Sequence, residues 1–303
     1  MDTDLSHLVQ LLTEVEQVDH AGEDTSEETL KAQLTFPGHD PLQDRWVVTA
    51  SNNKQLIGYS SVWKVPENNY ADIYVAVHPD WRRQGIGSEL LQRIVSRAQA
   101  HHPQDILVSA DAQNQRVKDF LQKRAFSSIA AYTAMRLANT VDLPQAVLPI
   151  GYTLRVYDPA NDFSLLLDMY NRAFQGLWGH WEHVTAENLY VWLQGMNPEG
   201  IFLLFTQNRE IVGTCRGEIS ELLSKQRGTR TGYLDAPGVV PEHRSQKLYL
   251  PQLLQAAHLV RGQEHNATIE MESWGDDSLV LAQYRQVGFE TTRQQDIYRW
   301  QGN

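Results

Sequence analysis

The sequence has little cysteine and no long hydrophobic run. Its single cysteine, Cys215, cannot form an intramolecular disulfide or a thiolate metal site. The longest apolar stretches, such as residues 201–205, fall far short of the ~20 residues that span a bilayer. A cationic segment followed by an apolar one, the mark of a secretory leader, is also missing from the start of the sequence. We therefore expect a cytoplasmic protein with no membrane partner.

Basic residues are outnumbered, with 26 Lys and Arg against 37 Asp and Glu, which gives a net charge of −11. Such a chain repels phosphate backbones, so nucleic acid is not an expected partner, whereas an amine-bearing small molecule is. Apolar residues make up 42% and charged residues 21% of the chain, which excludes disordered and collagen-like classes. The sequence contains no heptad repeat and leaves the oligomeric state open.

Two segments of the sequence resemble each other at an offset of 162 residues. Residues 77–91 (VHPDWRRQGIGSELL) align with residues 239–253 (VVPEHRSQKLYLPQL), and at an offset of 163 the match continues to Phe126 and Phe289. A length of 303 residues also favours two domains. We therefore predict two α/β domains, each a mixed, twisted sheet flanked by helices, over residues 1–138 and 152–303, with a Pro- and Gly-containing linker over residues 139–151.

The periodicity of the first half predicts alternating strands and helices. The expected strands are Arg45–Ala50, Gln55–Val65, Ala71–Val77, Ile106–Ala110 and Ala131–Leu137, and the expected helices are Gly87–Ala100 and Arg116–Arg124.

The loop between the third of these strands and the first helix has the features of an anion cradle. Backbone N–H groups at a helix N-terminus have no intrahelical acceptor. Gly85 and Gly87 would let a diphosphate approach the backbone, and Arg82 and Arg83 could add charge-assisted hydrogen bonds. A dinucleotide fingerprint would need a third glycine where Leu90 stands, and the Gly-Lys-Ser/Thr of a P-loop is missing.

This stretch resembles the acetyl-coenzyme A motif of the GNAT acetyltransferase superfamily, V-x-P-x-x-R-x-x-G-x-G. The motif positions are filled by Val77, Pro79, Arg82, Gly85 and Gly87. The resemblance implies two tandem GNAT-like acyl-CoA N-acyltransferase domains, a layout similar to that of the mycothiol synthases. It also implies acetyl-CoA as cosubstrate and direct attack by a primary amine in a ternary complex. The residues that the resemblance assigns to the cosubstrate are Val75, Val77, Arg82, Arg83, Gln84, Gly85, Ile86, Gly87, Ser88 and Asn114.

A second superfamily motif, N-x-x-A-x-x-x-Y-x-x-x-G-F, is only partly kept in the first half. Asn114, Val117, Ala125 and Phe126 preserve its outline, but Leu121 replaces the tyrosine. A thiolate leaving group has a pKa near ~8.5, so the loss of that hydroxyl can be tolerated.

The second half has changed in the opposite way. Lys247 and Tyr249 stand at the two glycine positions, whereas Tyr284 keeps the tyrosine. A tyrosine side chain blocks close approach of a diphosphate to the backbone. We therefore predict that coenzyme A binds the first half only.

Acetyl transfer to an amine requires that the alkyl ammonium, with a pKa near ~10.4, first lose a proton. Strand alternation puts Asp72 and Tyr74 on one face, with Asp72 the candidate base and Tyr74 a positioning or acid candidate. The alternatives are a strand-edge charge and a core aromatic. In the superfamily a backbone N–H near this strand end binds the oxyanion, which implicates the main chain of Val75 and Val77. The other candidate bases are bulk water and a carboxylate of the second half, such as Asp235 or Glu182.

The remaining signals are weaker. An aromatic loop around Trp178 and Trp181 could line an acceptor pocket or pack in the core, as could Trp192. His180 and His183 are two possible ligands without a third, so no metal site is expected. The competing functional hypothesis is an acyl-CoA-binding regulatory or scaffold protein that no longer catalyses transfer, and a longer acyl donor also remains open.

Overall fold

The computed structural model describes residues 2–36, 39–51, 54–65, 69–174, 177 and 183–302. The chain forms two compact units. Unit 1 comprises Met1–Ala130 and Gln295–Asn303, and unit 2 comprises Ala131–Gln294.

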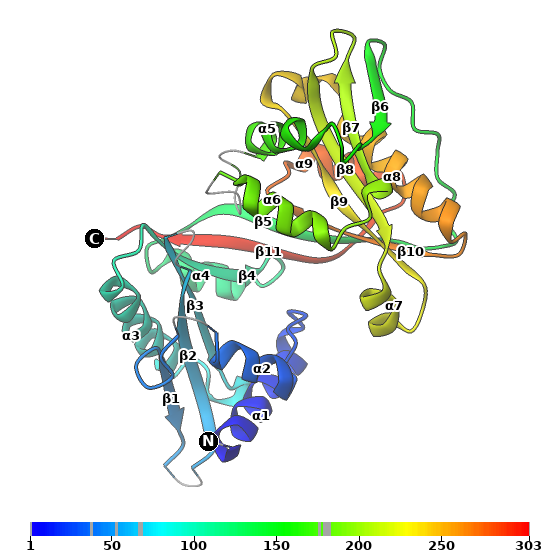
Figure 1. Cartoon of the computed structure of the whole chain (residues 1–303). Coiled ribbons are helices and arrows are strands. Elements are labelled where there is room, and N and C mark those ends of the chain that lie inside the picture. The colour runs from blue at the N-terminus through cyan, green and yellow to red at the C-terminus, as the bar shows by residue number, and fades with distance from the viewer. Residues whose placement is uncertain are drawn as a thin grey trace. The chain divides into compact units, whose positions relative to one another are not determined.

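Unit 1 is built from elements of the first half and from the C-terminal end of the chain (Figure 1). In chain order these are α1 (Asp2–Asp19), α2 (Glu27–Leu34), β1 (Arg45–Thr49), β2 (Leu56–Val65), β3 (Tyr70–Val77), α3 (Ile86–Ala100), β4 (Asp105–Asp111), α4 (Gln115–Gln122), the start of β5 (Phe126–Leu137) and the end of β11 (Glu290–Trp300).

The sheet of unit 1 has helices on both faces. Strands β1, β2 and β3 are antiparallel neighbours, β3 and β4 run parallel, and β11 pairs antiparallel with β4. The amphipathic helix α3 buries Leu91 and Ile94 against one face, and the leucines of α1, such as Leu11, pack on the other. Gly58 of β2 permits this close packing, because a Cβ atom there would lie 3.0 Å from Leu90 of α3.

Unit 2 repeats this plan with one more strand. Its elements are β6 (Tyr152–Val156), α5 (Phe163–Phe174), α6 (Ala186–Gln194), β7 (Ile201–Thr206), β8 (Ile211–Ile219), α7 (Glu221–Arg227), β9 (Thr231–Val239), α8 (Tyr249–Gln263), β10 (Thr268–Trp274), α9 (Ser278–Gln286), the end of β5 and the start of β11.

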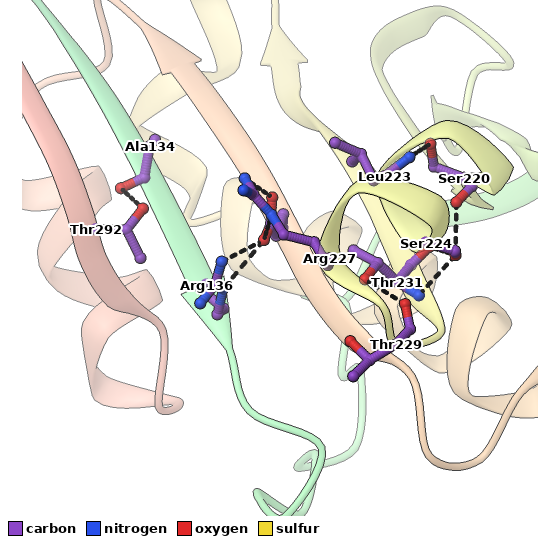
Figure 2. Close-up of polar contacts among 10 residues, drawn as sticks. Ala134, Arg136, Ser220, Leu223, Ser224, Arg227, Thr229, Thr231 and Thr292 are labelled. Atoms are coloured by element: carbon purple, nitrogen blue, oxygen red, sulfur yellow. Dashed lines mark hydrogen bonds and ion pairs between the residues drawn. The ribbon is translucent and has the colours of Figure 1, made fainter. Parts of the chain in front are cut away.

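Strands β6 to β10 are hydrogen-bonded neighbours in the order β6-β7-β8-β9-β10, and β5 pairs with β10. Arg136 of β5 and Arg227 of α7 both donate to the carboxylate of Glu270 on β10 (Figure 2). Thr292 donates its hydroxyl to the carbonyl of Ala134, which fastens β11 to β5 (Figure 2).

The predicted repeat is confirmed by the order of the elements. The series β3, loop, α3, β4, α4, β5 is matched by β9, loop, α8, β10, α9, β11. The backbone keeps the correspondence in detail, since Gly85 and Lys247 occupy equivalent positions and both have left-handed φ angles, of 88° and 58°. A lysine in this conformation is strained where a glycine is not.

The compact units differ from the ranges expected from the sequence in one respect. The closing strand of each half pairs with a strand of the other half: Leu137 of β5 lies opposite Ile269 of β10, and Ile297 of β11 lies opposite Ser109 of β4. The division therefore falls inside β5 and β11 and not at residues 139–151. The local pattern of an apolar strand does not reveal which sheet it joins.

Candidate functional site

Strands β3 and β4 part beyond the first few residues of their pairing. Tyr70–Asp72 lies against Asp105–Leu107, and no further pairing between the two strands exists within residues 69–111, all of which are described. Strand β3 nevertheless continues to Val77. The other edge of β4 is paired with β11. The edge of β3 that faces β4 is thus open toward the carboxyl ends of the two strands.

The main chain of Val75 and Val77 faces this open edge. His78 donates its N–H to the carbonyl of Ile57 at 2.9 Å. Because antiparallel ladders alternate, the backbone of Ala76 bonds to β2 as well, and the N–H groups of the residues between point away from β2. The main-chain N–H groups of Val75 and Val77, which the sequence analysis gave as candidate donors, therefore face the open edge of β3.

The loop between β3 and α3 presents a series of open N–H groups. Within the described part of the chain, nothing accepts a hydrogen bond from the N–H groups of residues 83–87, whereas Ser88 and Glu89 donate theirs to the carbonyl of Gly85. Arg83 and Gly85 both have left-handed φ angles, of 66° and 88°. A Cβ atom at Gly85 would meet no protein atom within 4 Å, so the space beside this backbone is open. This is the geometry of an anion cradle.

Arg82 does not point into that cradle. Its two terminal nitrogens donate to the two carboxylate oxygens of Asp19, each at 2.8 Å, and its Nε donates to the carbonyl of Val77. The second half repeats the last contact, since Arg244 donates its Nε to the carbonyl of Val239 at 3.2 Å. The arginine of the motif therefore holds the strand end in place in both halves, and in unit 1 it also fastens α1.

Arg124 is a cation at the cradle that the sequence analysis missed. Its Nη2 donates to the hydroxyl of Ser88 in the first turn of α3 at 2.6 Å, and its Nη1 donates to the carbonyl of Phe120. The guanidinium lies 3.8 Å from the centre of the Phe120 ring. The available signal was the spacing of Phe120 and Arg124, four residues apart at the end of the predicted helix.

Asn114 and Leu121 mark the start and the core-facing side of α4. Asn114 follows the carboxyl end of β4, and its Oδ1 caps the helix by accepting from the N–H of Val117 at 3.2 Å. Leu121 is 3% exposed and packs among core side chains. The position where the superfamily has its tyrosine hydroxyl is therefore apolar here.

The predicted alternation of β3 side chains is confirmed by the packing. Ile73 belongs to the cluster under α3, and Ala76 belongs to the cluster under α1 and α2. Asp72 and Tyr74 lie on the face of the α1 and α2 side. Burial raises the pKa of Asp72 to about 7, and the N–H of Ile73 opposes this shift only in part.

Tyr74 has an acidic partner. Its hydroxyl donates to Glu23 at 2.9 Å, and burial followed by the charge of Glu23 raises its pKa well above the ordinary value. It is consequently suited to positioning and poorly suited to giving up a proton. His78 contacts the carboxylate of Glu14 at 2.9 Å, so α1 and the segment after it supply acidic groups to this end of β3.

The equivalent loop of unit 2 carries bulkier side chains where unit 1 has its two glycines. Tyr249, at the second glycine position, is half-buried against the core, and Pro251 removes one N–H from the first turn of α8. The hydroxyl of Tyr284 is buried without a hydrogen-bond partner among the described residues. Nearby, burial raises the pKa of Asp276 to about 6.

The other sequence candidates have these positions. Asp235 is engaged by Arg216, whose Nε donates to it at 2.6 Å. Trp192 is 45% exposed, and burial raises the pKa of the Cys215 thiol far above its ordinary value, as expected for an inert side chain. Trp178, His180, Trp181 and Glu182 lie outside the described residues.

The described residues contain no group of three or more His, Cys, Asp or Glu side chains arranged to hold a metal ion. No helix among them combines the length and the apolar character that a membrane span needs.

The model of the acetyltransferase (GNAT) family matches residues 8–126, which contain β3, the glycine loop, α3 and α4. Residues 8–126 belong to the GNAT family. The resemblance inferred from the glycine motif is thereby confirmed for the half in which that motif is intact.

Proteins similar to this chain in sequence include mycothiol acetyltransferases. The protein from Thermomonospora curvata is 30% identical over 205 residues, which cover 60% of this chain and 64% of the relative. The protein from Salinispora tropica is 29% identical over 173 residues, covering 53% of this chain and 52% of the relative. The chain therefore spans between half and two thirds of the length of these relatives.

Solved GNAT structures resemble the chain over nearly its whole length. A GCN5-related N-acetyltransferase from Sphaerobacter thermophilus gives a TM-score of 0.71 at 19% identity, covering 99% of this chain and 93% of the other. A tandem GNAT protein from the clavulanic acid biosynthesis pathway gives 0.60 at 16% identity, covering 98% and 94%. The expected tandem GNAT fold is confirmed.

Proposed function

We propose that the protein is an N-acetyltransferase that binds acetyl-CoA in unit 1 and transfers the acetyl group to a primary amine of a small molecule. The observation that carries the proposal is the open edge of β3, which leads directly into the unpaired N–H groups of residues 83–87. The diphosphate would bind at the loop, and the pantetheine arm would lie in the slot between β3 and β4. The mycothiol acetyltransferase relatives support a small-molecule acceptor.

In the proposed reaction the neutral amine attacks the thioester carbonyl, a carbon–nitrogen bond forms, and the carbon–sulfur bond breaks to release the coenzyme thiolate. The proton that the nitrogen then loses is taken up by this thiolate, which gives the amide and the free thiol. The main-chain N–H groups of Val75 and Val77, which point away from β2, would stabilise the oxyanion. Asp72, with a pKa raised to about 7, would take the proton from the ammonium form directly or through one water. Leu121 offers no acid, and a thiolate with a pKa near ~8.5 leaves without one.

The proposal is tested by incubating the purified chain with acetyl-CoA and a panel of primary amines while following release of the free thiol. We expect turnover with at least one amine and a coenzyme stoichiometry of one per chain by calorimetry. Two equal coenzyme sites per chain would contradict the assignment to unit 1.

A second candidate function is an acyl-CoA-binding protein without catalysis. The observation in its favour is the apolar environment of Leu121, which leaves the first half without the hydroxyl acid of the family. Coenzyme binding with a stoichiometry of one, together with no thiol release above the hydrolysis rate for any amine of the panel, would select this function.

A further inference from the structure

Arg82, the arginine of the glycine motif, makes its hydrogen bonds away from the cradle. Both terminal nitrogens of Arg82 are bonded to Asp19, and its Nε is bonded to the main chain of Val77. Arg83 is exposed, and no described contact fixes its side chain. A diphosphate carries two negative charges, so a cradle of N–H groups gains affinity from a fixed positive charge close by.

Arg124 supplies a fixed charge at the right place. Three contacts hold its guanidinium: the hydroxyl of Ser88, the carbonyl of Phe120 and the face of the Phe120 ring. Ser88 lies in the first turn of α3, and the Phe120 ring is 3.7 Å from where a Cβ atom of Gly87 would lie. The guanidinium is therefore adjacent to the cradle, and it is half-buried, so water screens its charge less than at an exposed site.

The degenerate half provides an independent comparison. Ala125 and Gly288 are equivalent by sequence offset and by their left-handed φ angles of 62° and 100°. By the same offset of 163 residues, Val287 stands in place of Arg124 and Gln283 in place of Phe120. By the offset of 162 residues that aligns the two loops, Leu250 stands in place of Ser88. The half that lost its glycines thus also lacks all three members of this cluster, as expected if the cluster serves the same ligand as the loop.

We propose that Arg124, seated on Phe120 and Ser88, binds a phosphate group of coenzyme A. This inference rests on the proposed function, because it takes the unit 1 cradle to be the coenzyme site. The recognised chemistry is a phosphate ester or anhydride, which the coenzyme carries both in its diphosphate and as its 3′-phosphate. The position of Ser88 beside the open N–H groups favours the diphosphate.

The test measures binding of coenzyme A, dephospho-coenzyme A and pantetheine by calorimetry to the full chain, to Arg124→Gln and to Lys123→Gln. Lys123 is the matched control, since it is the exposed neighbour on the same helix end and the change removes the same charge. We expect Arg124→Gln to weaken coenzyme A and dephospho-coenzyme A by about 10- to 100-fold, as for loss of a charged hydrogen bond. Pantetheine should bind as before, and Lys123→Gln should bind all three ligands like the wild type.

Weakening of coenzyme A alone would support the phosphate contact and assign it to the 3′-phosphate. Equal weakening of pantetheine, which has no phosphate, would mean a structural role and would overturn the inference. Arg124→Lys, which keeps the charge and loses the planar contacts, should recover part of the affinity and guards against a folding defect. Unchanged binding by Arg124→Gln overturns this inference alone, whereas failure of the wild type to bind coenzyme A overturns the proposed function and this inference together.

Discussion

At the scale of single residues, Asp72 combines a buried carboxyl with a position beside the open edge of β3. Because its pKa is raised to about 7, it becomes a competent base only as pH rises through neutrality. We expect kcat/KM to rise with pH up to about 7 and then level. Asp72→Asn should lower turnover about 10²–10⁴-fold and abolish this limb, measured with saturating acetyl-CoA between pH 5.5 and 9.

Tyr74→Phe is the control for that profile, because Tyr74 is held by Glu23 and serves to position. It should raise the Michaelis constant for the amine, and kcat/KM should still rise with pH up to about 7. Near-full turnover by Asp72→Asn at neutral pH would assign the base to another group.

The same carboxyl makes a prediction about stability. The folded-state pKa of Asp72 lies above the ordinary value, so between about pH 4 and 7 the folded protein holds a proton that the unfolded chain has lost. The contribution of Asp72 to the free energy of unfolding is therefore lost as pH rises through 7. We expect the free energy of unfolding of Asp72→Asn, measured by urea denaturation and taken relative to wild type, to be higher at pH 8 than at pH 5.5. Asp80→Asn, at an exposed site, should show no such difference.

Ala125 adopts a left-handed backbone conformation, with φ at 62°, where its counterpart is Gly288. A non-glycine residue loses roughly 1–2 kcal/mol in this region, and the extra chain entropy of glycine returns about 0.5–1 kcal/mol of that. Ala125→Gly should thus stabilise the protein by about 0.5–1 kcal/mol in chemical denaturation. Ala32→Gly, the same change at an exposed position inside helix α2, should destabilise it by a similar amount.

At the scale of elements, the β3–loop–α3 unit makes its ligand contacts through the backbone, so a side chain added there acts by obstruction. Gly85→Val would place its side chain in the open space where the diphosphate is proposed to bind. We expect coenzyme affinity to fall at least about tenfold, measured by calorimetry. Lys247→Val introduces the same residue at the equivalent left-handed position of unit 2 and should leave affinity unchanged. Equal losses in both variants would show that the effect comes from strain and not from the site.

The loop and its flanking elements could be predicted because their signals are local. The alternation of Asp72 with Ile73 and the paired glycines 85 and 87 depend only on neighbouring residues. The partner of Arg82 could not be predicted, since Asp19 is 63 residues away and no periodic pattern links them. Arg124 was missed for a similar reason: its contact with Ser88 joins two helices whose packing the sequence does not specify.

At the scale of the whole molecule, the sequence predicted the duplication but not the pairing of the closing strands. The sequence of residues 131–137 and 295–299 contains nothing that depends on which sheet these strands complete, so their pairing partners could not be predicted from it. The expected linker at residues 139–151 follows a Pro and Gly signal that marks a change of direction along the chain, and the compact units are divided elsewhere.

The pairing of the closing strands offers a reason why the second half is kept although its loop has lost both glycines. The end of β11 forms ladder hydrogen bonds with β4, beside the strand on which the proposed site is built. Losing the second half would strip the first of this strand and leave the edge of β4 uncovered. Selection on the proposed site of unit 1 would therefore also preserve the second half, while the loop of that half could change. The first half would then be kept for the proposed site, and the second half for the end of β11 that pairs with β4.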